Sequence, residues 1–297
     1  MNTVIFAMPG NGQLARDLAS ITGAELGLLE YRKFPDRESY LRFNTEMQNK
    51  QAILACSLHD PDIKVLPLLL AAAALRDLGA TSIGLAAPYL AYMRQDRRFK
   101  AGEAITSTDF ARLLSTFFDW IATIDPHLHR HAAMSEIYTI PVLVSHATPV
   151  LADYVRQHAD GAFLIGPDEE SEQWVAAVAS AAEVPHVTLA KERRGDRDVA
   201  ITIPDISAFA GKTPVLVDDV ISSGRTMEVA VQELRKLGFH RPICLAAHGL
   251  LADNAHARLI AAGASVVVTN TIPGPTSLLD IHPLFAELIK PQLRERT

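Results

Sequence analysis

The sequence predicts an α/β fold in which mainly parallel sheets are flanked by helices. Short apolar runs alternate with amphipathic, helix-like segments along the whole chain, as strands and helices do in parallel sheets. No low-complexity segment or long linker interrupts this alternation. The length of 297 residues, of which 48% are hydrophobic, is sufficient for two ordinary α/β domains with well-packed cores.

The expected elements of the first half follow from apolar runs and from helix end signals. Runs of about five apolar residues predict buried strands. The Ala/Leu-rich segment that stops at Gly79 is too long for a strand and predicts a helix. The expected strands are residues 3–7, 51–57, 82–86 and 120–124, and the expected helices are residues 12–21, 65–78 and 107–117.

The second half repeats this pattern. Apolar residues recur at three- and four-residue spacing from Met227 to Leu237, and Gly238 follows, so this segment predicts a helix with one buried face. The expected boundary lies at residues 141–145, which gives domains 1–142 and 143–297. The other expected helices are residues 147–157, 172–182 and 254–262, and the expected strands are residues 163–165, 215–217, 243–247 and 265–269.

Composition argues against several classes of partner. The formal net charge is −6 and the isoelectric point is near 6.0, so we expect no nucleic-acid partner and no anionic membrane surface. The longest apolar run, residues 65–75, contains Pro67 and is too short to span a bilayer. The first residues lack the basic segment of a signal peptide. Cys56 and Cys244 lie in apolar runs, which predicts buried thiols in a reducing, cytoplasmic environment.

Residues 213–227 combine features that few structural roles require. An apolar run delivers two adjacent carboxylates, Asp218 and Asp219, and a loop of small and hydroxyl-bearing residues follows before a helix begins. Carboxylates at a strand end suit a sugar or a hydrated cation, and the N–H groups of the loop and helix N-terminus suit a phosphate. An ordinary polar turn after a buried strand is the structural alternative. The paired acids beside Ser-Ser-Gly-Arg-Thr favour a functional site.

This stretch resembles the ribose-5-phosphate loop of type I phosphoribosyltransferases and of the ribose-phosphate pyrophosphokinase family. The shared pattern is an apolar strand, two Asp, two apolar residues and a Ser/Thr/Gly-rich loop that ends in Thr. The resemblance implies that Asp218 and Asp219 hold the ribose hydroxyls and that Mg²⁺ is the cofactor. It also implies that the 5-phosphate is held by Ser222, Ser223, Gly224, Arg225 and Thr226. Arg225 departs from the small residue that many relatives carry there.

A second stretch, residues 88–99, argues against a simple transferase. It is similar to the Pro-Tyr-x-x-Tyr-x-Arg-Gln-Asp-Arg element of the pyrophosphokinase family, and it follows the expected strand 82–86. Ligands of α/β sheets bind at such strand ends. The resemblance implies ATP contacts for Arg94, Gln95 and Arg97, and the planar guanidinium suits phosphate because it bonds two oxygens at once. An exposed basic loop is the structural alternative.

Residues 33–38 form a charged turn between two strand-like runs, and the residues alone predict a solvated hairpin. The turn resembles the family's Phe-Pro-Asp-Gly-Glu element, which contacts adenine, often from a neighbouring subunit. The resemblance implies adenine contacts for Phe34, Asp36 and Glu38, and a homo-oligomer with an active site near a subunit interface. Arg37 stands where the family has Gly, which leaves the backbone of this turn open.

Residues 125–131 place three histidines at alternate positions after the expected strand 120–124, and this pattern invites a metal-site interpretation. The family has Asp-Leu-His at this point. The resemblance therefore implies a contact with the triphosphate or with Mg²⁺ for His127. His129 and His131 have no support from the family, and whether they bind anything is open.

Residues 165–171 again place acids after an expected strand. Asp168 matches a Pro-Asp pair in the family's pyrophosphate-binding segment, and with His127 it is the expected metal contact. Glu169 and Glu170 replace small residues of the family. Their charge would repel a phosphate unless Mg²⁺ intervenes or the two side chains turn away.

Residues 189–196 are charged and contain a glycine, so composition alone predicts a flexible, exposed loop. The segment resembles the family's flexible catalytic loop, whose Lys-x-Arg pair Lys191 and Arg193 match. The resemblance implies that both are catalytic. A loop that closes over the phosphates excludes water from the reaction.

Matches to the family run in order from near residue 9 to near residue 273. The resemblance implies two tandem phosphoribosyltransferase-like domains, with ATP on the N-terminal side and ribose 5-phosphate on the C-terminal side. The implied reaction is diphosphoryl transfer from ATP to the sugar, which gives phosphoribosyl pyrophosphate and AMP. A type I phosphoribosyltransferase and a non-catalytic paralogue that assembles with an active partner are the alternatives.

Overall fold

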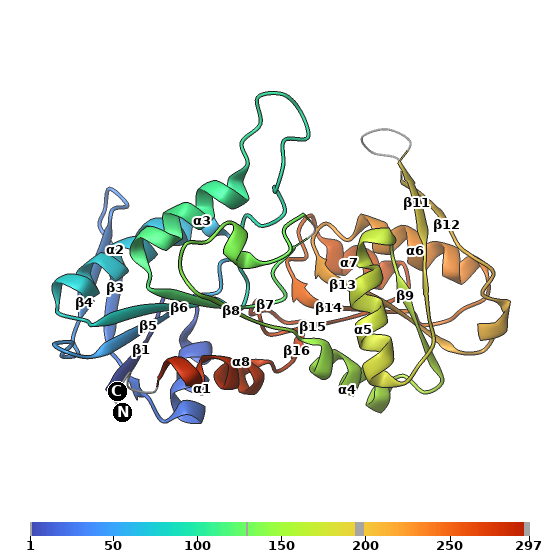
Figure 1. The fold of residues 1–297 in the computed structure, drawn as a ribbon. Coiled ribbons are helices and arrows are strands. Elements are labelled where there is room, and N and C mark those ends of the chain that lie inside the picture. The colour runs from blue at the N-terminus through green and yellow to red at the C-terminus, as the bar shows by residue number, and fades with distance from the viewer. Residues whose placement is uncertain (1, 129, 194–198, 294–297) are drawn as a thin grey trace. The chain divides into compact units, whose positions relative to one another are not determined.

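The computed structural model describes residues 2–128, 130–193 and 199–293. They form two compact units, which are described separately below (Figure 1). The first unit comprises the chain up to Ser145 together with the C-terminal segment from His282, and the second comprises His146–Ile281. The division lies close to the expected boundary at residues 142 and 143. The C-terminal segment differs from the expectation, because it clusters with the first unit.

A six-stranded parallel sheet forms the centre of the first unit, with the order β2-β1-β5-β6-β7-β8. Helices α2 and α3 cover one face and helices α1 and α8 cover the other, and β3 and β4 form a separate antiparallel hairpin (Figure 1). The strands are β1 (Thr3–Ala7), β2 (Glu25–Leu26), β3 (Leu29–Lys33), β4 (Ser39–Phe43), β5 (Gln51–Ala55), β6 (Ser82–Ala86), β7 (Trp120–Ile124) and β8 (Val142–Ser145). The helices are α1 (Gly12–Thr22), α2 (Pro61–Asp77), α3 (Thr106–Phe117) and α8 (His282–Ile289), with short 3-10 turns η1 (Met134–Glu136) and η4 (Lys290–Gln292).

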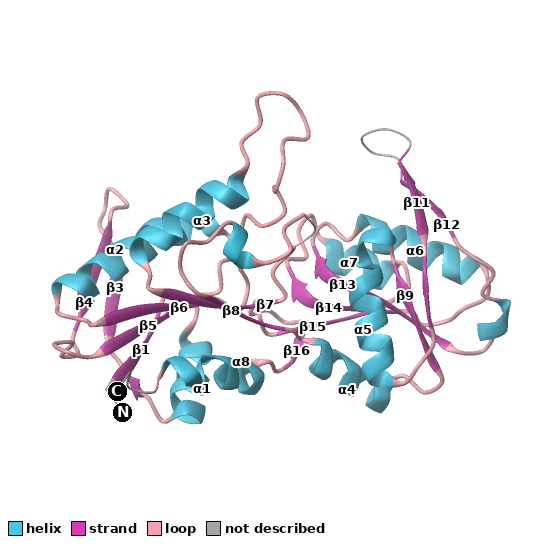
Figure 2. Ribbon diagram, viewed as in Figure 1, coloured by secondary structure: helices cyan, strands magenta, loops and turns pink. Residues whose placement is uncertain are grey.

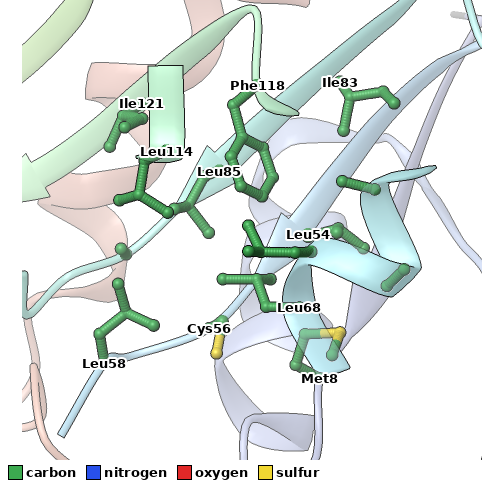
Figure 3. Packing of buried hydrophobic residues seen from close by; sticks show 14 of the residues in the cluster. Met8, Leu54, Cys56, Leu58, Leu68, Ile83, Leu85, Leu114, Phe118 and Ile121 are labelled. Carbon is green, nitrogen blue, oxygen red and sulfur yellow. The ribbon is translucent and has the colours of Figure 1, made fainter. Parts of the chain in front are cut away.

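The core of the first unit lies between this sheet and helices α2 and α3. Leu54, Leu85 and Ile121 project from neighbouring strands toward Leu68 of α2 and Leu114 of α3, and all five side chains are fully buried (Figure 3). Burying one such side chain contributes about 1.5–3 kcal/mol. The rigid sheet edge that results is the platform for the loops discussed below.

A second six-stranded parallel sheet forms the centre of the other unit, with the order β10-β9-β13-β14-β15-β16. Figure 2 shows the antiparallel ribbon of β11 and β12 extending beyond this sheet. The strands are β9 (Ala162–Gly166), β10 (His186–Thr188), β11 (Ala190–Arg193), β12 (Val199–Thr202), β13 (Thr213–Ile221), β14 (Ile243–Gly249), β15 (Ser265–Thr269) and β16 (Ser277–Leu279). The helices are α4 (Thr148–His158), α5 (Glu172–Ala182), α6 (Arg225–Lys236) and α7 (Ala255–Ala261), with 3-10 turns η2 (Glu169–Ser171) and η3 (Ser207–Phe209).

The predicted α/β class with mainly parallel sheets is confirmed, and individual elements differ in length. Strand β13 continues through both Asp residues to Ile221, whereas the sequence predicts its end at residue 217. Helix α6 buries Met227 and Leu234 as expected, but Leu237 follows the helix and is 58% exposed. Among the described helices, none combines the length and apolar character needed to cross a bilayer.

The strand order of the second sheet reverses between β9 and β13. From β9 the chain proceeds to β10 on one side, and from β13 it proceeds through β14 to β15 on the other. Open α/β sheets bind ligands outside the carboxyl ends of the two strands that flank such a reversal. Asp168 follows β9, and Asp218 and Asp219 lie near the end of β13, so all three acids belong to this position.

Candidate functional site

The two adjacent acids of the second unit lie in the last part of β13, which pairs with β14 up to Ile221. Asp219 is 3% exposed and Asp218 is half-buried. The Asp218 carboxylate accepts a hydrogen bond of 2.9 Å from the backbone N–H of Asp219. The strand ladder therefore fixes the backbone that presents both carboxylates at the sheet edge.

The negative charge of Asp168 acts on the Asp218 carboxylate of this pair. Burial raises the pKa of the Asp218 carboxyl well above its usual value, and the neighbouring charges of Asp219 and Asp168 raise it further. Carboxylates that repel one another in this way favour a cation or hydroxyl donors between them. The structure thus brings together three of the predicted residues of the second unit.

The donor set at the strand ends fits Mg²⁺ only in part. Among the described residues, no group of three or more His, Cys, Asp or Glu side chains could hold a metal ion alone. Mg²⁺ usually retains several waters and is bound by one or two carboxylates together with substrate phosphates. The hard oxygen atoms of Asp168 and Asp218 suit that incomplete protein contribution.

Asp168 also has a structural role. Its carboxylate caps the turn η2 by accepting the backbone N–H of Ser171 at 3.3 Å, and the Ser171 hydroxyl donates to the Asp168 carbonyl at 2.6 Å. The side chains of Glu169 and Glu170, which depart from the family's small residues, are exposed. Exposure to water screens their charges and weakens the repulsion of a phosphate.

The loop after β13 is shorter than expected, because α6 begins at Arg225. Arg225 is exposed, and Thr226 lies with it in the first helical turn. The first turn of a helix carries N–H groups that have no acceptor within the helix, and these groups attract phosphate. Ser222, Ser223 and Gly224 therefore form the loop proper, while Arg225 and Thr226 form the helix N-terminus.

Gly224 is required by the local geometry. Its φ of +66° lies in the left-handed region, and a Cβ added there would lie 3.1 Å from the Cβ of Ala255 in α7. Both restrictions favour glycine over any other residue. Helix α7 thus packs directly behind the loop.

Arg258 of α7 holds the same loop, and the sequence gives no signal for it. Its Nε donates to the Glu228 carboxylate at 2.9 Å, and its terminal nitrogens donate to the backbone carbonyls of Ser223 and Asp253. Glu228 lies in the first turn of α6. Glu228 and Ser223 are 30 and 35 residues from Arg258 in the sequence, which is why a local motif does not reveal these interactions.

In the first unit, residues 88–99 leave the carboxyl end of β6 as expected and continue to α3. Arg94 and Arg97 are exposed, and Gln95 is half-buried. The Gln95 carbonyl accepts a hydrogen bond of 3.3 Å from the N–H of Ser107 in α3. Tyr92 has a φ of +63° and its hydroxyl donates to Asp62 of α2. The loop is therefore anchored while its arginines remain accessible.

The structure brings His127 and the Arg94–Arg97 loop to the same sheet edge. His127 follows β7, which is the neighbour of β6, and the N–H of Ile124 donates to the carbonyl of Pro88 at 3.1 Å. An ion pair between the buried carboxylate of Asp96 and the exposed Arg130 also joins the two segments. His129 lies outside the described residues, and His131 contacts Glu136.

The expected solvated hairpin is confirmed by the exposed tip of β3 and β4. Arg37 adopts a φ of +73°, so it takes the left-handed backbone that glycine normally provides. Phe34 packs edge-on against Tyr40, with ring centroids 5.9 Å apart. In the part of the chain that is described, no hydrogen bond or ring contact links Phe34, Asp36 or Glu38 to residues 94–97. Asp36 and Glu38 instead line a cavity of 1040 Å³ whose opposite wall is α2.

Lys191 and Arg193 lie in strand β11 rather than in a loop. The backbone of Lys191 pairs with Ile201 and that of Arg193 pairs with Val199 in the antiparallel ribbon. Residues 194–198 lie outside the described residues. The expected loop thus corresponds to an antiparallel ribbon at these two positions.

Comparisons with known proteins cover both units. Residues 3–117 match the N-terminal domain of ribose phosphate pyrophosphokinase, and residues 133–280 match the phosphoribosyl transferase domain. A ribose-phosphate pyrophosphokinase of Methanopyrus kandleri is 31% identical over 97% of this chain and 98% of its own length. The chain belongs to the ribose-phosphate pyrophosphokinase family. The matches cover nearly its full length and both of its units, so the predicted family and the two tandem phosphoribosyltransferase-like domains are confirmed.

Further relatives support the same assignment. The ribose-phosphate pyrophosphokinase of Thermoplasma acidophilum is 29% identical, over 96% of this chain and 98% of its own length. A crystal structure of phosphoribosylpyrophosphate synthetase from Mycobacterium smegmatis superposes with a TM-score of 0.85, at 29% identity and with 98% of each chain covered. A lone phosphoribosyltransferase domain would leave one unit of this family member unmatched.

Proposed function

We propose that the chain is a ribose-phosphate diphosphokinase, which transfers the β,γ-diphosphoryl group of ATP to ribose 5-phosphate. The products are phosphoribosyl pyrophosphate and AMP. The observation that carries the proposal is the geometry at the strand-order reversal of the second sheet. There, Asp168 follows β9, and Asp218 and Asp219 lie near the end of β13, which leads to the N-terminus of α6. Family membership over the whole chain supports the same reaction.

The second unit binds the sugar in this proposal. Asp218 and Asp219 accept hydrogen bonds from the ribose hydroxyls, because ionised carboxylates are acceptors only. The N–H groups of Ser222–Thr226 and the hydroxyls of this segment donate to the 5-phosphate. The strand ladder under the acids and the helix behind the loop hold the sugar rigidly, which is the main requirement of such a transfer.

The first unit binds ATP. The guanidinium groups of Arg94 and Arg97 donate to phosphate oxygens, and Gln95 and His127 add donors at the same sheet edge. The ring of Phe34 stacks on adenine, and the carboxylates of Asp36 and Glu38 accept from its exocyclic amine. The family resemblance supports the roles of the hairpin residues, which are exposed at its tip.

In the transfer itself, the 1-hydroxyl oxygen of the sugar forms a bond to the β-phosphorus of ATP. The bond between that phosphorus and the α,β-bridging oxygen breaks, and AMP leaves with the bonding electrons. The hydroxyl proton passes to solvent. Lys191 and Arg193 on the β11–β12 ribbon neutralise the charge of the transferring group, and one cation of this kind is worth about 10³–10⁵ in rate in related reactions.

Mg²⁺ is the proposed cofactor. When bound, it would neutralise the charge of the phosphates. Asp168 and Asp218 would provide carboxylate oxygens for it. His127 serves the triphosphate better than the metal, since Mg²⁺ prefers oxygen ligands.

We further propose a homo-oligomeric, cytoplasmic enzyme. The exposed hairpin with Phe34 at its tip supports an active site completed by a neighbouring subunit. Cys56 and Cys244 are buried free thiols, and two such thiols are typical of reducing compartments. Light scattering coupled to size exclusion tests the oligomer, and a monomer that is fully active would contradict it.

The test of the proposed function is a reaction of purified protein with Mg²⁺ and ATP, in which AMP is measured with and without ribose 5-phosphate. AMP that forms only with the sugar supports the proposal. Lack of sugar-dependent AMP would contradict it and favour a non-catalytic paralogue. A transferase would instead consume phosphoribosyl pyrophosphate together with a base, which a parallel reaction detects.

A further inference from the structure

Arg130 connects two segments that the proposed function places around ATP. Its Nη1 lies 2.8 and 3.0 Å from the two carboxylate oxygens of Asp96. Asp96 stands between Gln95 and Arg97, and Arg130 belongs to the segment that contains His127. One side chain therefore joins the loop after β6 to the segment after β7.

The Asp96 carboxylate is the buried member of this ion pair. Its side chain is 2% exposed, whereas that of Arg130 is 36% exposed. A buried carboxylate is costly unless a cation and hydrogen bonds compensate it, so removal of the cation disturbs the backbone that carries the acid. The positions of Asp96 and of its neighbours Gln95 and Arg97 therefore depend on Arg130.

Phe99 provides a second connection. The Cζ atom of Arg97 lies 4.9 Å from the centroid of the Phe99 ring, and that of Arg130 lies 5.9 Å from it. Both separations are within the range of a cation–π interaction. A guanidinium that contacts a ring face keeps its N–H groups available for phosphate oxygens. The ring thus aligns Arg97 with Arg130 without occupying the donors of Arg97.

Contacts within the loop support the same geometry. The Glu103 carboxylate accepts a hydrogen bond of 2.8 Å from the N–H of Phe99, and the N–H of Ser107 in α3 donates to the Gln95 carbonyl. These contacts fix the loop to itself and to α3. Arg130 fixes its middle part to the end of β7, where His127 lies.

We infer that Arg130 is a positioning residue for the diphosphoryl donor. It acts through Asp96 and Phe99, and it holds Gln95 and Arg97 in the geometry that receives the phosphates of a magnesium–nucleoside triphosphate complex. The inference rests on the proposed function. It adds a residue that no motif of the sequence identifies, because its importance follows from a contact between two separate segments.

Steady-state kinetics of Arg130→Gln test the inference. We expect the KM for ATP to rise about tenfold or more, because misplacing binding groups by about 1 Å has effects of this size. The KM for ribose 5-phosphate is expected to stay unchanged. Arg76→Gln is the matched control: Arg76 forms a surface ion pair of 3.1 Å with Asp119 in the same unit, and its loss is expected to leave both constants unchanged.

A double-mutant cycle separates positioning from a general loss of stability. The double variant Arg130→Gln/Asp96→Asn changes the KM for ATP by some factor. If Arg130 acts through Asp96, this factor is smaller than the product of the factors that the two single variants give. Arg130→Lys retains the charge but loses the planar guanidinium, so we expect an intermediate KM. Single effects that multiply fully would contradict action through Asp96.

Calorimetric binding of a non-hydrolysable ATP analogue with Mg²⁺ gives a readout that is independent of turnover. Phe99 is 54% exposed, so Phe99→Leu removes the aromatic ring without creating a cavity in the core. We expect the Kd of this variant for the ATP analogue to rise about two- to fivefold, because both cation–π contacts are lost. Arg130→Gln with wild-type melting temperature and wild-type affinity would overturn the inference. If Arg130→Gln does not fold, unchanged affinity in both Arg130→Lys and Phe99→Leu overturns it. Wild-type protein that forms no sugar-dependent AMP would instead overturn the proposed function.

Discussion

Arg258 donates a hydrogen bond of 2.9 Å from Nε to the carboxylate of Glu228, across the contact between α7 and α6. A second nitrogen of the same guanidinium donates to the Ser223 carbonyl. In a planar trans peptide the carbonyl and the following N–H point in opposite directions. Arg258 therefore fixes the direction of the Gly224 N–H as well, and so sets the orientation of the proposed 5-phosphate loop.

Arg258→Ala is expected to raise the KM for ribose 5-phosphate about tenfold while the KM for ATP stays unchanged, because the loop loses its orientation. The measurement is steady-state kinetics with each substrate varied in turn. Arg235→Ala is the control, since Arg235 also joins α6 to the end of α7, by a 3.0 Å bond to the Ala262 carbonyl far from the loop. An equal change in the KM for ribose 5-phosphate in both variants would contradict a specific role for Arg258.

Gly224→Ala is expected to lower the free energy of unfolding by about 1–3 kcal/mol, because alanine is strained at a positive φ. The added methyl group would also press on Ala255 of α7. Denaturant titration measures the loss, and Gly211→Ala is a useful comparison, since its φ is +80° and nothing lies within 4 Å of the added Cβ. A smaller loss at Gly224 than at Gly211 would argue against the steric contact.

Asp218→Asn is expected to stabilise the protein at neutral pH and to abolish most activity. The pKa of Asp218 is raised above its usual value by burial and by the neighbouring acids. Between the usual and the raised value the folded state retains a proton that the unfolded state has lost, so the free energy of unfolding falls as pH rises through this window. Asparagine cannot ionise and removes that dependence.

We therefore expect the melting temperature of Asp218→Asn to exceed that of wild-type protein by a few degrees at pH 7, and the difference to vanish below the usual pKa of an aspartate. Mg²⁺ is expected to raise the melting temperature of wild-type protein more than that of the variant, because it neutralises the acids. Scanning calorimetry over pH, with and without Mg²⁺, checks both. A melting temperature of Asp218→Asn below that of wild-type protein at neutral pH would contradict the repulsion between Asp218 and its neighbouring acids.

Arg193→Ala is expected to lower kcat about a hundredfold or more with the fold intact, because it removes a cation from the transferring group. Single-turnover kinetics and circular dichroism provide the measurement. Arg156→Ala, which breaks a surface ion pair with Asp153 in the same unit, is the control. Near-normal turnover of Arg193→Ala would remove the β11–β12 ribbon from the mechanism.

Local patterns were sufficient to predict most of the fold. Apolar runs identified the central strands because parallel strands are buried on both faces. The extension of β13 through Asp218 and Asp219 was not predictable, since Asp disfavours strands and the ladder with β14 compensates for it. The C-terminal segment packs against α1 and β8, and in this contact His282 and Asp17, which are distant in sequence, lie 2.7 Å apart. No local pattern contains such a contact.

The candidate site was predictable where chemistry is concentrated in a short motif. Asp218 and Asp219 stood out because two adjacent acids precede a glycine-containing loop. Arg130 and Arg258 did not stand out, because each contacts a loop that belongs to a different part of the sequence. Arg130 follows β7 and contacts the loop after β6, and Arg258 lies in α7 and contacts the loop after β13. The resemblance placed Arg37 at a glycine position of the family, and the structure shows that Arg37 keeps a left-handed backbone, because the turn and not the residue type imposes it.

The most direct test of the proposed reaction is product analysis by phosphorus NMR after incubation with Mg²⁺, ATP and ribose 5-phosphate. We predict AMP and a sugar that carries a diphosphate on its 1-oxygen, formed in equal amounts, and neither product when the sugar is omitted. Formation of ADP with a singly phosphorylated 1-oxygen, or no sugar-dependent product, would contradict diphosphoryl transfer by this chain.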